Sequence, residues 1–332
     1  MYHAIEQHQE VFYNSKILDF YFENLNIGVI DIETTGINPL RNRFILGGLL
    51  VPDSAGKCTM QFFAESKEEE TALLHTYLSH LRDLDVLISY NGDQFDIPFL
   101  MKRLQNYNTN TDDLLFCYSF DIYQILHRFS MLRKVLPNLQ QKTVEAFLGL
   151  WSKRTDEISG AESVELYYRF LGTGDSTVRD IILLHNKDDI LQLSRLIKIL
   201  GKLDLHEIMF HMGFPVAFKE MRAFIKKITM KNNVLSISGI HKNISTGYRC
   251  YQPTHDAVFS VKSREFTLSI PWMNIRGLRC LDLESFQFDC SDLGKYPNYH
   301  SGYMLLENNF QLNYAEINHF IKLIIKEIMK EL

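Results

Sequence analysis

The sequence predicts an α/β fold with a mixed sheet flanked by helices, followed by a β-rich α+β region. Strand and helix patterns alternate between residues 25 and 203, whereas short strands with period-two patterning prevail after residue 204. The Gly- and Pro-containing stretch GKLDLHEIMFHMGFP separates the two parts. We therefore expect an N-terminal extension over residues 1–24, an α/β domain over 25–203, and a C-terminal α+β region of unknown role over 204–332.

The alternating part supplies its strands and helices in order. Residues 26–33 (NIGVIDIE) form a short apolar, β-branched run that ends in acids, as expected of a buried strand. Ser66, with Glu69 three residues later, predicts a capped helix start. The expected strands are 26–33, 44–51, 59–64, 85–90 and 115–121, and the expected helices are 67–81, 95–104, 122–129, 139–148, 163–171 and 178–200.

The C-terminal region predicts antiparallel hairpins and a final helix. Residues 224–230 and 234–240 flank the turn sequence KNN, and residues 258–261 and 266–270 flank a second turn. An amphipathic pattern covers residues 314–330. Basic residues at the hairpin ends, beside Phe259 and Phe266, suggest a nucleic-acid platform or, more simply, charges that prevent edge-to-edge strand pairing. These residues are Lys226, Lys227, Lys231, Lys262 and Arg264.

Composition is typical of a folded globular protein with a substantial core, since 46% of the residues are hydrophobic. The formal charge of −5 divides into −8 over residues 1–200 and +3 over residues 201–332, which argues against tight nucleic-acid binding by charge alone. The five cysteines are scattered without a CxxC pair, which argues against a disulfide framework and a zinc site. Because no signal-peptide pattern or membrane-length apolar run occurs, we expect a cytoplasmic protein without a membrane segment, and we predict no protein partner.

An acidic pair ends the first strand, in the sequence DIETTG. Residues two apart on a strand point to the same side, so Asp31 and Glu33 present two carboxylates together while Ile32 faces the other way. Two adjacent carboxylates repel each other, and a bound cation would neutralise them. Taken alone, the pair is better explained as two solvated acids at a strand end.

Two further acidic clusters follow. The sequence NGDQFDIPFL comes after a strand and opens a helix, where Asp93 or Asp96 is by itself best explained as a helix-start residue. The sequence HNKDDIL places His185 and Asp189 four apart, hence on one helix face. A lone helical His–Asp pair is usually a surface contact or a satisfied core histidine.

The three clusters together resemble the exonuclease motifs of the DEDD superfamily, which has an RNase H-like fold. DIETTG matches the DxE motif, Asn91 to Asp96 match the NxxxFD motif, and His185 with Asp189 match the third. The chain is most similar to the bacterial YprB-like subfamily of predicted exonucleases, also over 139–149 (LQQKTVEAFLG), 154–160 (RTDEISG) and 185–193 (HNKDDILQL). The resemblance covers roughly residues 25–200 and does not extend into the C-terminal region.

This resemblance implies a 3′–5′ exonuclease that hydrolyses DNA or RNA with two divalent cations. Asp31, Glu33, Asp96 and Asp189 would be the metal ligands, with Asp31 bridging both ions. His185 would be the general base, although its spacing of four from Asp189 is that of the tyrosine-type variant. Four carboxylates without a thiol cluster favour Mg²⁺ or Mn²⁺ over zinc.

The substrate contacts and the class of activity are less closely defined. Thr34, Thr35 and the side chain of Asn91 are candidates for binding the terminal nucleotide, and simple turn chemistry explains the two threonines equally well. An endonuclease or oligonucleotide hydrolase would use the same site. A noncatalytic nucleic-acid-binding module is the alternative from a different class, and loss of a motif acid, which would favour it, has not occurred.

Overall fold

The computed structural model describes residues 1–109, 116–150 and 158–332. The chain forms two compact units, the first comprising Met1–Ser15 and Leu25–Leu203, the second Lys16–Asn24 and Asp204–Leu332. Residues 1–24, expected as an extension, are thus divided between the two. Within the described ranges, no helix has the length and apolarity needed to cross a membrane.

The first unit is built on a six-stranded mixed sheet in the order β1-β4-β3-β2-β5-β6. The pairs β2–β5 and β5–β6 are parallel, and the other neighbours are antiparallel. The strands are β1 (Tyr2–His8), β2 (Ile27–Thr34), β3 (Phe44–Asp53), β4 (Gly56–Phe63), β5 (Val86–Ser89) and β6 (Tyr118–Asp121). The sequence prediction of a mixed sheet is confirmed. Leu115, the expected start of the last strand, lies outside the described residues.

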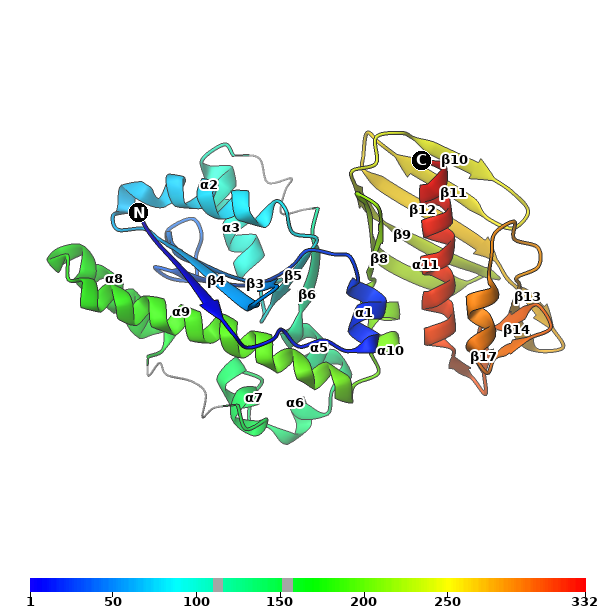
Figure 1. The fold of residues 1–332 in the computed structure, drawn as a ribbon, viewed down its shortest axis with the longest axis horizontal. Helices are drawn as coiled ribbons and strands as arrows, with labels where there is room; N and C mark the ends of the chain where they lie inside the picture. Colours follow the sequence, from blue (N-terminus) through cyan, green and yellow to red (C-terminus); the bar gives the residue numbers. More distant parts are fainter. Residues whose placement is uncertain (110–115, 151–157) are drawn as a thin grey trace. The chain divides into compact units, whose positions relative to one another are not determined.

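Helices cover both faces of this sheet (Figure 1). On one face, side chains of α2 and α3 such as Leu73 and Phe99 pack with Ile30 and Ile32 of β2. On the other, α8 and α9 pack on β3 and β4. The helices are η1 (Lys67–Glu69), α2 (Glu70–Leu81), α3 (Asp96–Asn106), α5 (Ile122–Phe129), α6 (Leu132–Val135), α7 (Gln141–Phe147), α8 (Gly160–Thr173), α9 (Ser176–Leu196) and η3 (Ile197–Lys202).

The helix start expected after Ser66 is confirmed, but the capping hydrogen bond expected of its side chain is wrong. The Ser66 side chain makes no capping hydrogen bond at the start of η1. The Glu69 carboxylate instead accepts from the Glu65 N–H and from the amino group of Met1. Met1 reaches this helix start because β1, at the edge of the sheet, pairs with β4. The capping box that does form, Ser159 with Glu162, opens α8.

The second unit contains a six-stranded antiparallel sheet in the order β10-β11-β12-β9-β8-β7. Its strands are β7 (Pro215–Phe218), β8 (Met221–Lys231), β9 (Val234–Lys242), β10 (Tyr248–Tyr251), β11 (Asp256–Ser260) and β12 (Glu265–Pro271). A four-stranded sheet contains β13 (Met273–Ile275), β14 (Leu278–Asp282), β15 (Tyr299–His300) and β16 (Tyr303–Leu305), and a hairpin joins β17 (Glu307–Asn308) to β18 (Gln311–Leu312). The helices are α1 (Lys16–Phe22), α10 (Leu205–Met212), η4 (Ser291–Lys295) and α11 (Tyr314–Glu331).

Both predicted hairpins of this unit form, so the β-rich C-terminal region is confirmed. Asn232 and Asn233 adopt positive φ angles of 52° and 58°, as the tight turn between β8 and β9 requires. Phe259 and Phe266 are both buried and stack on each other with ring centroids 4.9 Å apart. The aromatic part of the nucleic-acid platform considered above is therefore wrong, because period-two alternation directs these rings into the core.

Candidate active site

Strand β2 places two carboxylates on the face of the sheet that α9 covers. Ile30 and Ile32 belong to the core cluster formed with α2 and α3, so the alternating Asp31 and Glu33 point the opposite way. Asp31 approaches α9 directly, because its Oδ2 accepts a hydrogen bond from Nδ2 of Asn186 at 2.8 Å. The predicted placement of both acids on one strand face is confirmed.

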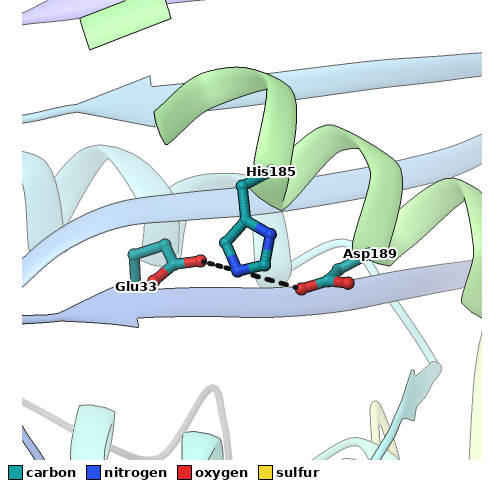
Figure 2. A group of neighbouring side chains, drawn as sticks. All are labelled: Glu33, His185 and Asp189. Atoms are coloured by element: carbon teal, nitrogen blue, oxygen red, sulfur yellow. Dashed lines mark ion pairs between the residues drawn. The ribbon is translucent and has the colours of Figure 1, made fainter. Parts of the chain in front are cut away.

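Glu33 meets His185 and Asp189 at the middle of α9. Nε2 of His185 lies 3.6 Å from Oε1 of Glu33 and 3.6 Å from Oδ2 of Asp189. Figure 2 shows the imidazole between the two carboxylates. One ligand atom from each of the three side chains falls within 4.8 Å of the others, close enough for a shared metal ion. The sequence spacing predicted one helix face for His185 and Asp189, and the structure adds Glu33 opposite them.

Asp96 comes to the same place from the start of α3. Its Oδ1 accepts a hydrogen bond from the Ile32 N–H at 3.2 Å. The carboxylate therefore lies against β2 at Ile32, the residue between Asp31 and Glu33. The side chain is buried. All four acids that the resemblance implied as ligands are thus brought together, from one strand and two helices.

The electrostatics of this cluster favour a bound cation. Burial raises the pKa of Asp31 well above its usual range, and the negative charges of Asp189, Asp96 and Glu33 raise it further. Burial also raises the pKa of Glu33 to about 7, although His185 lowers it. The pKa of Asp96 likewise rises to about 7 through burial, against the effect of its backbone hydrogen bonds. A divalent cation would replace the missing solvation and relieve the repulsion.

The donor set fits hard cations. Four carboxylates offer oxygen ligands, which Mg²⁺ and Mn²⁺ prefer, and His185 offers a single imidazole nitrogen. The five cysteines all lie in other parts of the structure, four of them buried. The residues present therefore fit the divalent cations that the sequence predicted.

Asn186 is a site residue that the sequence analysis missed. It is fully buried and donates to Asp31, while its own Oδ1 accepts from Nε2 of Gln61 at 2.9 Å. Gly48, opposite Asp31 in β3, makes room for it: a Cβ there would lie 2.2 Å from Oδ1 of Asn186. Gln61 and Asn186 thus fix the orientation of the Asp31 carboxylate.

Asp121 is a second missed residue and holds the loop that leads to Asp96. Its carboxylate accepts from the backbone N–H groups of Asn91 at 2.8 Å and Asp93 at 3.2 Å, and it caps α5. Asn91 has a positive φ of 66°, which an asparagine tolerates better than most residues. The sequence did contain a signal for Asp121, because this acid ends an expected strand and immediately precedes an expected helix.

A pocket of about 840 Å³ opens beside the acids. Asp31, Glu33, His185 and Asp189 line it, together with the end of β2 and residues of α7 and α8. Thr34 is also part of the lining. The hydroxyl of Thr35 instead accepts from the Arg43 N–H at 2.9 Å, and Asn91 and Thr35 are not among the described lining residues. Substrate contacts by these three residues remain predictions.

Comparison with known proteins supplies the family. A model described as the RNase_H superfamily matches residues 29–201, which is more than half of the chain. Among solved structures, the chain is similar to the family B DNA polymerase from the hyperthermophilic archaeon Pyrobaculum calidifontis. That similarity has 19% identity and a TM-score of 0.43, and it covers 53% of this chain but only 24% of the polymerase. No curated protein matches the chain.

The family match agrees with the RNase H-like, nuclease-type fold expected from the three acidic clusters. Assignment to the DEDD superfamily and to its YprB-like subfamily remains a prediction. The matched residues include the whole of the acidic cluster described above, from Asp31 to Asp189. The chain therefore belongs to the RNase_H superfamily.

Proposed function

We propose that this protein is a metal-dependent 3′–5′ exonuclease that hydrolyses phosphodiester bonds of DNA or RNA. The observation that carries the proposal is one buried cluster of four carboxylates and an imidazole. Asp31, Glu33, Asp189 and His185 line the pocket, and Asp96 lies against β2 beside them. They come from β2, α3 and α9, three elements that are far apart in the sequence. Packing of these elements alone does not require acidic side chains at one place. The family match and the high pKa values of the buried acids support it.

Each residue has a proposed role. Asp31 would bridge two divalent cations, Glu33 and Asp189 would complete one site, and Asp96 would serve the second. When bound, such ions activate a water molecule and stabilise the leaving 3′ oxygen in an in-line displacement. His185 accepts the proton of the attacking water at Nε2, which lies between Glu33 and Asp189. Asn186 and Gln61 hold Asp31 in place without touching the substrate.

We expect the scissile bond to lie in the pocket beside the acids. Its volume of about 840 Å³ lies in the range of small-molecule sites and is sufficient for the end of a strand. Thr34 and the backbone at Gly36 lie in its wall, on the loop that follows the acids. We expect this loop to contact the terminal nucleotide while the acids hold the phosphate that follows it.

The proposal is tested with a single-stranded oligonucleotide labelled at its 5′ end, with Mg²⁺, Mn²⁺ or EDTA. We expect a ladder of shortening labelled products that requires a metal and is blocked by a modified 3′-terminal linkage. Asp189→Asn should abolish it. Asp180→Asn, which removes an exposed acid from the same helix, is the matched control and should not. Internal fragments would instead indicate an endonuclease, and binding without any cleavage would indicate a noncatalytic module.

A further inference from the structure

One stretch of the first unit has a charge pattern opposite to that of its surroundings. Between Asp121 and Glu145 the chain carries four Lys or Arg side chains and no acid, although residues 1–200 have a net charge of −8. We call residues 122–144 the basic segment. Its cations are Arg128, Arg133, Lys134 and Lys142. Protein surfaces ordinarily mix charges of both signs, so a stretch of one sign indicates a polyanionic ligand.

Three of the four cations of the basic segment are available to a ligand, whereas Lys142 donates to the Ile158 carbonyl. Arg128, Arg133 and Lys134 are exposed, and none of the ion pairs within the described ranges joins them to an acid. Beside them, Met131 and Val135 are 64% and 65% exposed. Exposed cations with apolar side chains between them suit an unpaired nucleic-acid strand, whose phosphates and bases are both accessible.

The basic segment also forms part of the pocket wall. Gln140, Gln141 and Lys142, at the start of α7, line the pocket. The hydroxyl of Tyr90 donates to the Leu139 carbonyl at 2.6 Å, which anchors this end of the segment. The segment therefore extends from the acidic site outward to α6.

The distance from the pocket to α6 has an upper limit. Val135, the last residue of α6, precedes Gln141 by six positions, so at about 3.5 Å per residue the two lie at most roughly 21 Å apart. At the 3.4 Å phosphate spacing of a duplex strand, about six nucleotides cover that length. A strand of six or more nucleotides is therefore long enough to reach α6 from the pocket, and a 20-mer exceeds this length.

We propose that the basic segment binds the phosphate backbone of a single strand whose 3′ end occupies the pocket. This inference rests on the proposed exonuclease function. The four acids of the site repel a polyanion, so attraction must come from elsewhere on the protein. Arg133 and Lys134 contact phosphates upstream of the cleaved bond, and Met131 and Val135 contact bases or sugars. The segment thus makes binding dependent on strand length.

The test measures binding of a labelled 20-mer and of a trinucleotide at salt concentrations from 0.1 to 1 M, in an Asp31→Asn background that prevents cleavage. Arg133→Gln with Lys134→Gln should lower the dependence of the 20-mer affinity on salt. Two lost phosphate contacts reduce the slope of log affinity against log salt concentration by about 1.4. The variant's loss of affinity should therefore be about 25-fold greater at 0.1 M salt than at 1 M salt. The loss should be larger for the 20-mer than for the trinucleotide. A fully paired 20-mer should bind less tightly than the single strand.

Lys198→Gln with Lys202→Gln is the matched control, because it removes two exposed lysines from the same unit. An equal loss in this control, or an unchanged salt slope in the Arg133 and Lys134 variant, would overturn the inference. A single Arg128→Gln variant checks the direction of the effect with a smaller perturbation. Cleavage of the 20-mer by the unsubstituted protein reports separately on the proposed function. If the unsubstituted protein cleaves the 20-mer but the Arg133 and Lys134 variant binds it normally, only the role of the basic segment is contradicted. If that variant loses binding but the unsubstituted protein does not cleave, only the exonuclease function is contradicted.

Discussion

The buried acids predict that the metal-free protein becomes less stable as pH rises. Glu33 and Asp96 each have a pKa near 7 in the folded protein, raised by burial from ordinary values of 4.5 and 3.8. A carboxyl group that holds its proton more tightly when folded stabilises the fold fully at low pH. That stabilisation is lost as pH rises through about 7. The perturbation is therefore a change from pH 6 to pH 8 in the presence of EDTA.

The size of the effect follows from the two pKa values. Each group loses about 1.3 kcal/mol of stabilisation between pH 6 and pH 8, because it is largely protonated at the first and ionised at the second. For Glu33 and Asp96 together the loss is about 2.5 kcal/mol. In a unit of about 200 residues this lowers the melting temperature by roughly 5–10 °C.

Thermal unfolding followed by circular dichroism, with EDTA and with Mg²⁺, measures this loss. Glu33→Gln should remove about half of it, because the amide does not titrate. Mg²⁺ should raise the melting temperature more at pH 8 than at pH 6, since protons compete with the cation for the same oxygens. A melting temperature that is the same at pH 6 and pH 8 in EDTA would refute the reasoning. So would a Glu33→Gln protein with an unchanged pH dependence.

Two substitutions test the supports of the site, and a third tests a buried ion pair of the first unit. Asn186→Ala should lower kcat about tenfold and raise the Mg²⁺ concentration needed for half-maximal activity, because losing a residue that orients a metal ligand typically weakens a metal site by about 10–100-fold. An unchanged metal titration would contradict this. Gly48→Ala should act in the same direction, because its Cβ would lie 2.2 Å from Oδ1 of Asn186. Glu70→Gln should lower the free energy of unfolding, measured with urea, by about 3–5 kcal/mol. The reason is that buried Arg103, which lies 2.6 Å from the Glu70 carboxylate, would lose its charged partner. A decrease below about 1 kcal/mol would show that the pair contributes little.

Local sequence patterns were sufficient for much of the fold. The alternation of apolar and acidic residues in β2 predicted that Asp31 and Glu33 share a face, and the four-residue spacing in α9 predicted that His185 and Asp189 do. The tight turn at Asn232 followed from residue type alone. These features depend on neighbours within one strand, helix or turn, where periodicity determines direction.

The residues that hold the site could not be predicted in the same way. Gln61 and Asn186 are 125 positions apart in sequence, and a buried amide pair has no local signature. Gly48 appears as an ordinary strand glycine until the packing of α9 on β3 is known. The contact between Met1 and Glu69 was equally hidden, because it depends on the pairing of β1 with β4.

The central claim is that the four acids bind two divalent cations. Diffraction from crystals grown with Mn²⁺, with anomalous data collected at the manganese edge, tests it most directly. We predict two anomalous peaks roughly 3.5–4 Å apart. Both should lie within coordination distance of Asp31, with Glu33 and Asp189 on one ion and Asp96 beside the other. No peak at the acids under saturating Mn²⁺, or peaks only at sites elsewhere in the protein, would contradict the claim.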